Sequence, residues 1–171
     1  MESSTETPTT PTKPLEVARA IFDALSKRDL DAVGEFLNDD TVDDFVAIGL
    51  VEGRAAIRTF FDTLLTAFPD FEMSVERIVG DKTTAVVQWH AAGTFSGGPF
   101  QGVDPTGKHV DVRGVDVMEI AQGRVKHNTI YYDGAAFARQ IGLLPAEGSA
   151  TEKAMVSAFN AATKLRKAVR R

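Results

Sequence analysis

The feature that most constrains the fold of this chain is a change in the spacing of its apolar residues at Pro69. Before this proline, apolar side chains recur every three or four residues over 15–27 and 54–68, which is the period of an amphipathic helix. From Phe71 to Tyr132 they tend to alternate with polar side chains, which is the period of a half-buried strand. Helices followed by a run of strands predict an α+β fold, with the helices on one face of a curved antiparallel sheet.

Four segments after Pro69 have the composition and the alternation of strands. A tight Ala-Gln-Gly-Arg turn joins the last two, and a long loop rich in glycine and proline joins the second to the third. Before the proline, 38–53 is expected to form a short strand and a loop. The four predicted strands are 71–79, 83–95, 109–120 and 124–132.

Two aspartates are placed to begin further helices. Asp29 is the predicted N-cap of a short helix that ends near Leu37, and Asp133 is that of a helix closed by Gly142. The segment 151–169 predicts a final amphipathic helix with the apolar stripe Met155, Phe159, Ala162, Leu165 and Val169. The chain therefore divides into three parts. Residues 1–14 are a tail rich in Thr, Ser, Pro and Glu that is expected to be disordered. Residues 15–144 form one domain, and 145–171 are a linker with a basic amphipathic C-terminal helix.

The composition excludes several kinds of site. The 171 residues include no cysteine, so disulfide bonds, thiolate catalysis and zinc–thiolate sites are ruled out. No apolar run approaches the roughly 20 residues of a membrane span, and 1–14 lacks the basic and apolar regions of a secretory signal. These features predict a cytoplasmic protein without a membrane partner.

Charge is distributed unevenly along the chain. The net charge is −5, although residues 150–171 contain six Lys or Arg and one Glu. The acidic remainder argues against a general nucleic-acid binder. The basic tail suits an anionic partner, or it complements the C-terminal end of a helix, whose dipole favours cations; we favour the second interpretation.

Asp116 stands in the middle of the predicted strand 109–120. Alternation puts it on the same face as Val110, Met118 and Ile120, so its carboxyl group is expected to point inward. A buried carboxylate without partners is costly, and such a group usually raises its pKa and stays neutral. A neutral Asp116 could donate a hydrogen bond to a ligand oxygen; the alternative is a structural bond to a backbone amide, a tyrosine or an arginine. Gly114, two residues earlier, is expected to mark a bend or a bulge that curves the sheet.

An ordered set of motifs from about Leu15 to Leu144 resembles the SnoaL-like polyketide cyclase family. The resemblance implies the nuclear-transport-factor-2-like fold: a cone-shaped curved antiparallel sheet wrapped around the N-terminal helices, with a ligand pocket inside. It also implies a homodimer, and the extra C-terminal helix lies outside the match. The motifs are AFPDF, GTF followed by DPTGK, GVDVMEI, GRVKHNTIYYD and FARQIGLLP.

The resemblance implies catalytic roles for two aspartates. GVDVMEI is similar to the ketosteroid isomerase strand that presents a protonated Asp to an oxyanion, which assigns that role to Asp116. DDTVDDF, with Gly53 nine residues beyond Asp44, resembles the segment that carries the general base of that enzyme. Asp44 is therefore the candidate base, with Asp43 as its neighbour.

Other positions depart from these relatives. The oxyanion tyrosine of the isomerase would fall near Ile21 or Phe22, which have no hydrogen-bond donor in their side chains. The catalytic Asp of SnoaL-like cyclases would fall on Ile130, and those cyclases usually have a histidine where this chain has its inward-facing Asp. Limonene epoxide hydrolases need the same Asp, plus an Arg and an Asp at the positions of Gln88 and His90, so their mechanism is not expected.

The family match points polar side chains of two strands at the pocket. Gln88 and His90 share one face of 83–95, although the opposite face, with Trp89, looks equally suited to the core and would leave His90 on the surface. Asn128 and Tyr132 share one face of 124–132, and Tyr132 could supply the missing phenol. The predicted ligand contacts are Gln88, His90, Asn128 and Tyr132.

No pattern of a metal or cofactor site is present. The histidines lie on separate segments without HxH or HExxH spacing, and the chain has no Walker or GxSxG motif. Three hypotheses follow. The first is a cofactor-free acid/base isomerase or cyclase for a small hydrophobic, polyketide-like or steroid-like carbonyl compound. The second is a binding protein that has lost catalysis, and the third is an interaction protein that uses its basic C-terminal helix.

Overall fold

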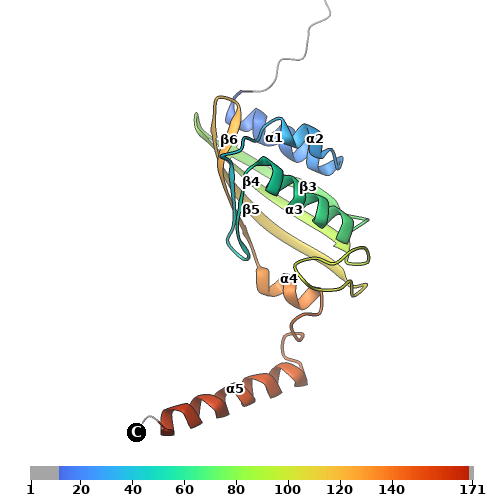
Figure 1. The fold of residues 1–171 in the computed structure, drawn as a ribbon, viewed down its shortest axis with the longest axis vertical. Helices are drawn as coiled ribbons and strands as arrows, with labels where there is room; N and C mark the ends of the chain where they lie inside the picture. Colours follow the sequence, from blue (N-terminus) through green and yellow to red (C-terminus); the bar gives the residue numbers. More distant parts are fainter. Residues whose placement is uncertain (1–11, 170–171) are drawn as a thin grey trace, which may run out of the picture.

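The computed structural model describes residues 12–169 and contains the helices and strands that the change of period predicts (Figure 1). The expected disordered tail, 1–14, lies outside the described residues except for its last three, of which Pro14 already begins the first helix. The elements are α1 (Pro14–Ser26), α2 (Leu30–Gly34), β1 (Val42–Phe45), β2 (Gly49–Glu52), α3 (Arg54–Ala67), β3 (Glu72–Gly80), β4 (Thr84–Thr94), β5 (His109–Ala121), β6 (Arg124–Tyr132), α4 (Gly134–Gln140) and α5 (Ala150–Val169).

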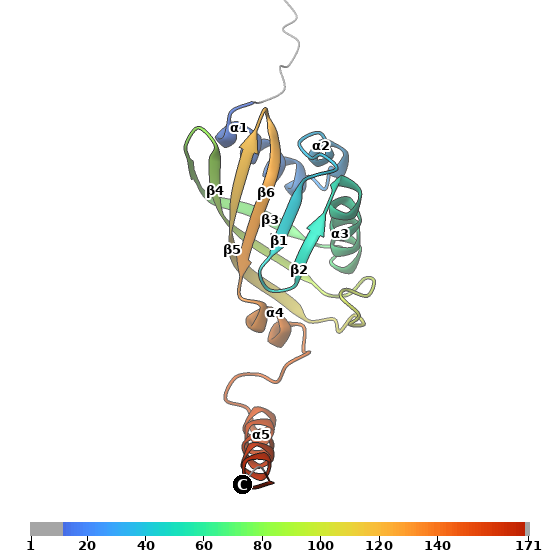
Figure 2. The same ribbon diagram turned by 60° about the vertical axis from the view of Figure 1, so that its left-hand side comes forward.

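The six strands form one curved sheet in the order β2-β1-β6-β5-β4-β3. The segment expected to hold one short strand and a loop is a hairpin of β1 and β2, which lies beside β6 (Figure 2). β1 runs parallel to β6, whereas the other neighbouring pairs are antiparallel, so the predicted antiparallel sheet is mixed at this point. A parallel pair needs a long connection, and the segment from β2 through α3 to β5 provides it.

Helices α1, α2 and α3 cover one face of the sheet (Figure 1). The buried face of α1, with Val17, Ile21 and Leu25, packs in the same core as Val87 and Met118 of the sheet. Burial of such side chains contributes about 1.5–3 kcal/mol each, so the helical stripe is what holds α1 in place. Curvature and helices together enclose the space in which the site lies.

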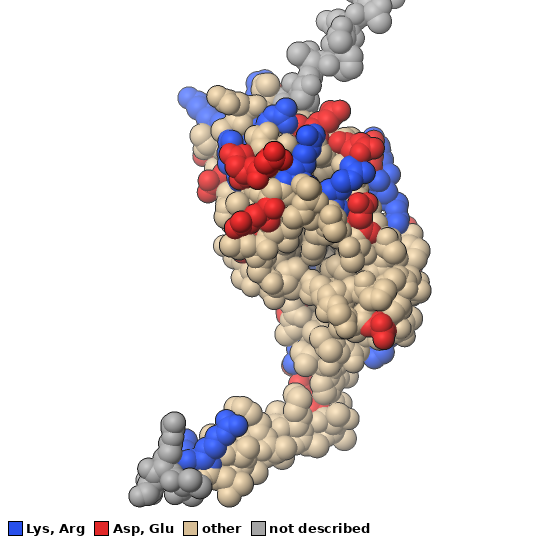
Figure 3. Space-filling view, in the orientation of Figure 1, with Lys and Arg blue, Asp and Glu red and all other residues tan. Residues whose placement is uncertain are grey.

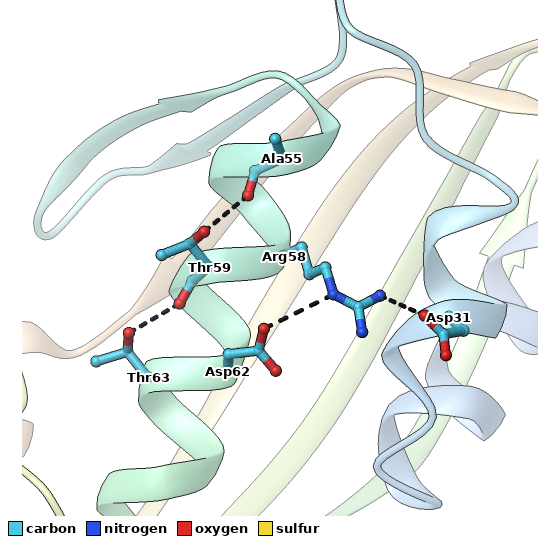
Figure 4. Close-up of polar contacts among 6 residues, drawn as sticks. All are labelled: Asp31, Ala55, Arg58, Thr59, Asp62 and Thr63. Atoms are coloured by element: carbon cyan, nitrogen blue, oxygen red, sulfur yellow. Dashed lines mark hydrogen bonds and ion pairs between the residues drawn. The ribbon is translucent and has the colours of Figure 1, made fainter.

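α3 also makes polar contacts on its exposed side (Figure 4). Nη1 of Arg58 lies 2.6 Å from Oδ1 of Asp31 at the start of α2, and its Nε lies 3.7 Å from Oδ2 of Asp62. The hydroxyl groups of Thr59 and Thr63 donate to backbone carbonyls four residues earlier. Exposed ion pairs contribute little to stability, so the apolar face of α3 holds this helix on the sheet.

The C-terminal end of α3 is capped by an arginine that is distant in the sequence. Arg28 donates from Nη1 to the Pro69 carbonyl at 2.7 Å and from Nη2 to the Leu65 carbonyl at 2.8 Å. The last carbonyls of a helix lack partners within the helix and carry partial negative charge, so a guanidinium group suits this place.

The predicted turn and caps are confirmed. Gln122 and Gly123 have φ angles of 54° and 75°, as a two-residue turn between β5 and β6 requires. The side chains of Asp29 and Asp133 accept from backbone N–H groups three residues later, at 3.0 and 2.8 Å. Gly142 follows α4 with a φ angle of 88°, a left-handed conformation that favours glycine.

The predicted C-terminal helix is confirmed, and it extends away from the sheet (Figures 1 and 2). It is tied to α4 by an ion pair in which Nη2 of Arg139 lies 3.3 Å from Oε1 of Glu152. Three residues of the apolar stripe are open to solvent: Met155 is 50% exposed, and Phe159 and Leu165 are each 68% exposed. No helix among residues 12–169 has both the length and the apolar character that crossing a membrane requires.

Candidate active site

A cavity lies between the inner face of the sheet and helices α1 and α3, and its wall is largely aromatic. Eight phenylalanines, Trp89 and Tyr132 line it, together with aliphatic side chains from β3, β4 and β5. Beyond the indole N–H, the polar side chains in the wall are those of Asp116, Asn128 and Tyr132. A mostly apolar wall with a few converging polar groups is typical of a site for a small hydrophobic ligand.

Asp116 is buried in this wall, so its predicted inward direction is confirmed. Its side chain is 7% exposed and accepts two hydrogen bonds. Nε1 of Trp89, on β4, donates to Oδ1 at 2.7 Å, and Nδ2 of Asn128, on β6, donates to Oδ2 at 2.9 Å. The partners are thus an indole and a carboxamide, which neither sequence hypothesis for this residue included.

The charge of Asp116 differs from the neutral form that burial alone predicts. Burial raises the pKa of Asp116 to about 6, while the hydrogen bonds from Asn128 and Trp89 act to lower it. Both partners donate N–H groups, which a carboxylate accepts better than a carboxylic acid does. Asp116 is therefore mostly ionised at neutral pH, although its pKa lies close enough for it to bind a proton.

The register of β5 and β6 gathers the polar groups on one face. Ile130 lies directly opposite Asp116, and Asn128 and Tyr132 stand two residues to each side of Ile130. Burial raises the pKa of Tyr132, so its phenol stays neutral and can donate a hydrogen bond. Asn128 and Tyr132 both line the cavity, and their contact with a ligand stays a prediction.

A second buried carboxyl group, Asp43, lies beside these groups on β1, on the same inner face of the sheet. It is 5% exposed and is the partner of Asn128 in the parallel pairing of β1 with β6. Burial, and then the negative charge of Asp116, raise the pKa of Asp43 to about 7, and the neighbouring Asn128 carboxamide partly opposes this rise. Sequence reasoning named Asp43 only as a neighbour, because a strand of four residues is too short for alternation to show which side is buried.

Asp44 lies on the other side of β1, where it is half-buried and opposite Leu50 and Thr129. It is absent from the cavity wall. Successive side chains of a strand point to opposite faces, so the burial of Asp43 requires Asp44 to face outward. The position expected for the general base is therefore held by a residue outside the cavity.

The predicted inward direction of Gln88 and His90 is wrong. Both lie on the outer face of β4, where Gln88 donates to Glu76 Oε2 at 2.7 Å and Nε2 of His90 lies 3.0 Å from Oδ1 of Asp111. The opposite face of β4, which carries Trp89, is the inner one. The sequence had left this possibility open. Within the described part of the chain, no group of three or more His, Asp or Glu side chains could hold a metal ion.

Gly114 makes room for the indole that contacts Asp116. It pairs with Trp89 across β4 and β5, and the pairing of the two strands is unbroken there, so the expected bulge lies elsewhere. A Cβ atom on Gly114 would lie 2.2 Å from Cζ2 of Trp89, closer than any real contact. Glycine is needed here because another side chain packs against its backbone.

Comparison with known proteins places the chain in a family. The family model described as SnoaL-like polyketide cyclase matches residues 15–141, which is most of the chain. The chain belongs to this family. No curated protein matches this SnoaL-like protein.

Solved structures share its fold. A protein from Jannaschia sp. CCS1, named for SnoaL-like polyketide cyclases, is 27% identical with a TM-score of 0.70, covering 84% of this chain and 100% of that one. IdmH from Streptomyces antibioticus, named as a polyketide cyclase, is 21% identical with a TM-score of 0.61, covering 74% and 96%. AclR from Streptomyces galilaeus, named as a hydroxylase, is 22% identical with a TM-score of 0.65, covering 75% and 95%. The predicted fold of a curved sheet around N-terminal helices is thus confirmed.

Proposed function

We propose that this SnoaL-like protein is a cofactor-free acid/base enzyme, a cyclase or an isomerase, that acts on a small hydrophobic carbonyl compound. The observation that carries the proposal is the position of Asp116: it is the carboxyl group in the wall of a largely apolar cavity. Its pKa of about 6 lies near neutral pH, where a general base is most effective.

In the proposed reaction, the Asp116 carboxylate removes a proton from the carbon next to a carbonyl group. The electrons of the broken C–H bond form an enolate. In a cyclase, the enolate carbon bonds to a second carbonyl carbon of the same molecule, and protonated Asp116 returns its proton to the resulting alkoxide. In an isomerase, Asp116 returns the proton to a different carbon instead.

Three neighbours support this role for Asp116. Trp89 and Asn128 hold its two oxygens by hydrogen bonds, so the carboxylate is oriented before the ligand enters. Tyr132 is the proposed donor to the enolate oxygen, because its phenol is neutral and lies on the same face of β6 as Asn128. A donor in a dry cavity stabilises such a charge more than it would in water.

The expected substrate is polyketide-like. The aromatic wall favours a flat, apolar molecule, and the polar groups near Asp116 would meet its carbonyl end. Several related structures are named as polyketide cyclases, which supports a carbonyl substrate of this kind.

The proposal can be tested with a probe that needs no knowledge of the natural substrate. Proton NMR in D₂O follows exchange of the acidic C–H protons of 2-tetralone, a bicyclic ketone, with wild type and variants. Asp116→Asn should slow the catalysed exchange by about 10²–10⁴-fold, the usual contribution of a general base. Asp44→Asn, the matched control, should leave the rate unchanged because this side chain lies outside the cavity.

Other outcomes of this experiment would refute the proposal or favour an alternative. Equal exchange by wild type and Asp116→Asn would refute Asp116 as the base, and loss of exchange in Asp44→Asn alone would support the role assigned by the sequence. Binding of the probe without exchange by wild type would favour the non-catalytic binding protein of the same fold. Quenching of Trp89 fluorescence measures that binding, because the chain has one tryptophan, which lies in the cavity wall.

The exposed stripe on α5 favours a second role in assembly. On the face of α5 that Figure 3 shows, the first half is largely uncharged, and the last turn of the helix is basic. Phe159 and Leu165 are large apolar side chains left open to solvent, which indicates that another protein surface covers them. We propose that the chain forms a homodimer, as the family resemblance implies, with α5 or the outer face of the sheet in the interface.

A further inference from the structure

Two buried carboxyl groups neighbour one carboxamide of the cavity wall. Asp116 on β5 accepts from Nδ2 of Asn128 on β6 at 2.9 Å, and Asn128 is the strand partner of Asp43 on β1. Asp43, Asn128 and Asp116 are 5%, 6% and 7% exposed. All three side chains are thus fixed by the sheet and shielded from water.

Asn128 has one hydrogen-bonding group without a partner. Its Oδ1 atom is buried, and no donor from the described residues reaches it. A buried acceptor without a donor is rare in folded proteins and costs free energy. A neighbouring group that carries a proton would remove this cost, and Asp43 is the neighbour that can carry one.

We propose that Asp43 is a positioning residue for Asp116: in its protonated form it donates its O–H to Oδ1 of Asn128 and so holds Nδ2 of this carboxamide on Asp116. The inference rests on the proposed function, in which Asp116 is the base. The three residues then form one chain of hydrogen bonds, from the carboxylic acid through the amide to the carboxylate. Asp43 itself does not line the cavity and touches no substrate.

The charges around the chain agree with this arrangement. Two carboxylates so close together repel each other, so the pair holds one proton near neutral pH. Asp116 accepts two N–H hydrogen bonds, which favour its ionised form, whereas burial and the charge of Asp116 raise the pKa of Asp43, so the proton stays on Asp43. The other ionisable side chain in the cavity wall is Tyr132, which is neutral. On its other side, Asp43 has the uncharged Val51 of β2 as its strand partner.

The arrangement predicts a second event as the pH rises. When Asp43 loses its proton near pH 7, it can no longer donate to Oδ1 and instead attracts Nδ2 of Asn128. Asp116 then shares or loses this donor. Its surroundings should therefore change at a pH above its own titration.

Carboxyl-carbon NMR titration of the full chain tests the proposal without a substrate. In wild type, the Asp116 resonance should move in two steps, one near pH 6 and one near pH 7. Asp43→Asn keeps an N–H donor for Oδ1 but cannot ionise, so the second step should vanish while the first stays. Asp40→Asn is the matched control, because Asp40 is exposed, pairs with Lys126 and should leave both steps in place.

Asp43→Leu removes the donor altogether. It should raise the pKa of Asp116 by about one, because the carboxamide is no longer held on the carboxylate. When the rate of 2-tetralone exchange is plotted against pH, the rise of the rate on the acid side should move to higher pH by the same amount. A second step that persists in Asp43→Asn, or an unchanged Asp116 titration in Asp43→Leu, would overturn the proposal and leave Asp43 a structural residue. Absence of ketone exchange with the two steps present would refute the proposed catalysis and not this inference.

Discussion

Gly114→Ala adds one methyl group to the site and tests the packing that orients Asp116. The new Cβ atom would lie 2.2, 2.6 and 2.7 Å from three ring atoms of Trp89. Non-bonded carbon atoms pack at about 3.5–4.0 Å, so the indole must move by more than about 1 Å. Trp89 is 6% exposed and its Nε1 is 2.7 Å from Oδ1 of Asp116, so this displacement breaks a buried hydrogen bond.

Two costs add in this variant. Overpacking a filled core costs about 1–3 kcal/mol, and loss of a hydrogen bond to a charged group costs about 1.5–3 kcal/mol. The free energy of unfolding should therefore fall by about 2.5–6 kcal/mol, less a few tenths because alanine lowers the entropy of the unfolded chain. The pKa of Asp116 should also rise, because the Trp89 hydrogen bond lowers it in the native protein.

A double-mutant cycle with Trp89→Phe isolates the cause. Phenylalanine lacks the ring atoms that the methyl group would meet, so Gly114→Ala should cost less than about 1 kcal/mol in that background. Urea denaturation followed by circular dichroism gives the four free energies. An equal cost of Gly114→Ala in both backgrounds would refute the reasoning, and the expected bend at Gly114 would then be the better account.

Three further predictions concern pH, capping and assembly. The pKa of Asp116 is about 6 in the folded protein against 3.8 in the unfolded chain, so its contribution to stability is fully present below pH 4 and is lost as the pH rises through about 6. Denaturation at several pH values should show that Asp116→Asn gains roughly 3 kcal/mol relative to wild type between pH 4 and pH 8, and a constant difference would contradict this. Arg28→Ala should lower the free energy of unfolding by about 1–2 kcal/mol because two carbonyls at the end of α3 lose their donors, whereas Arg19→Ala, on an exposed position of α1, should change it little. In sedimentation velocity, Phe159→Asp should give monomers if α5 forms the dimer interface, and a dimer that survives this change would point to the outer face of the sheet.

The sequence by itself determined the order and type of the elements, except for the second strand of the β1–β2 hairpin. The change of apolar period at Pro69 separates helices from strands, the caps Asp29 and Asp133 mark two helix starts, and the face shared with Met118 and Ile120 turns Asp116 inward. These features depend on neighbours a few residues away, and the period of a helix or a strand records such neighbours directly.

The tertiary structure decided which face is inner and what the buried groups meet there. Alternation divides β4 and β1 into two faces, but only the curvature of the sheet shows that Trp89 and Asp43 lie inside while His90 and Asp44 lie outside. The charge of Asp116 depends on donors that are 27 and 12 residues away in the sequence, on β4 and β6. Burial alone predicts a neutral acid; the two N–H groups that the strand register brings to it make it a carboxylate at neutral pH.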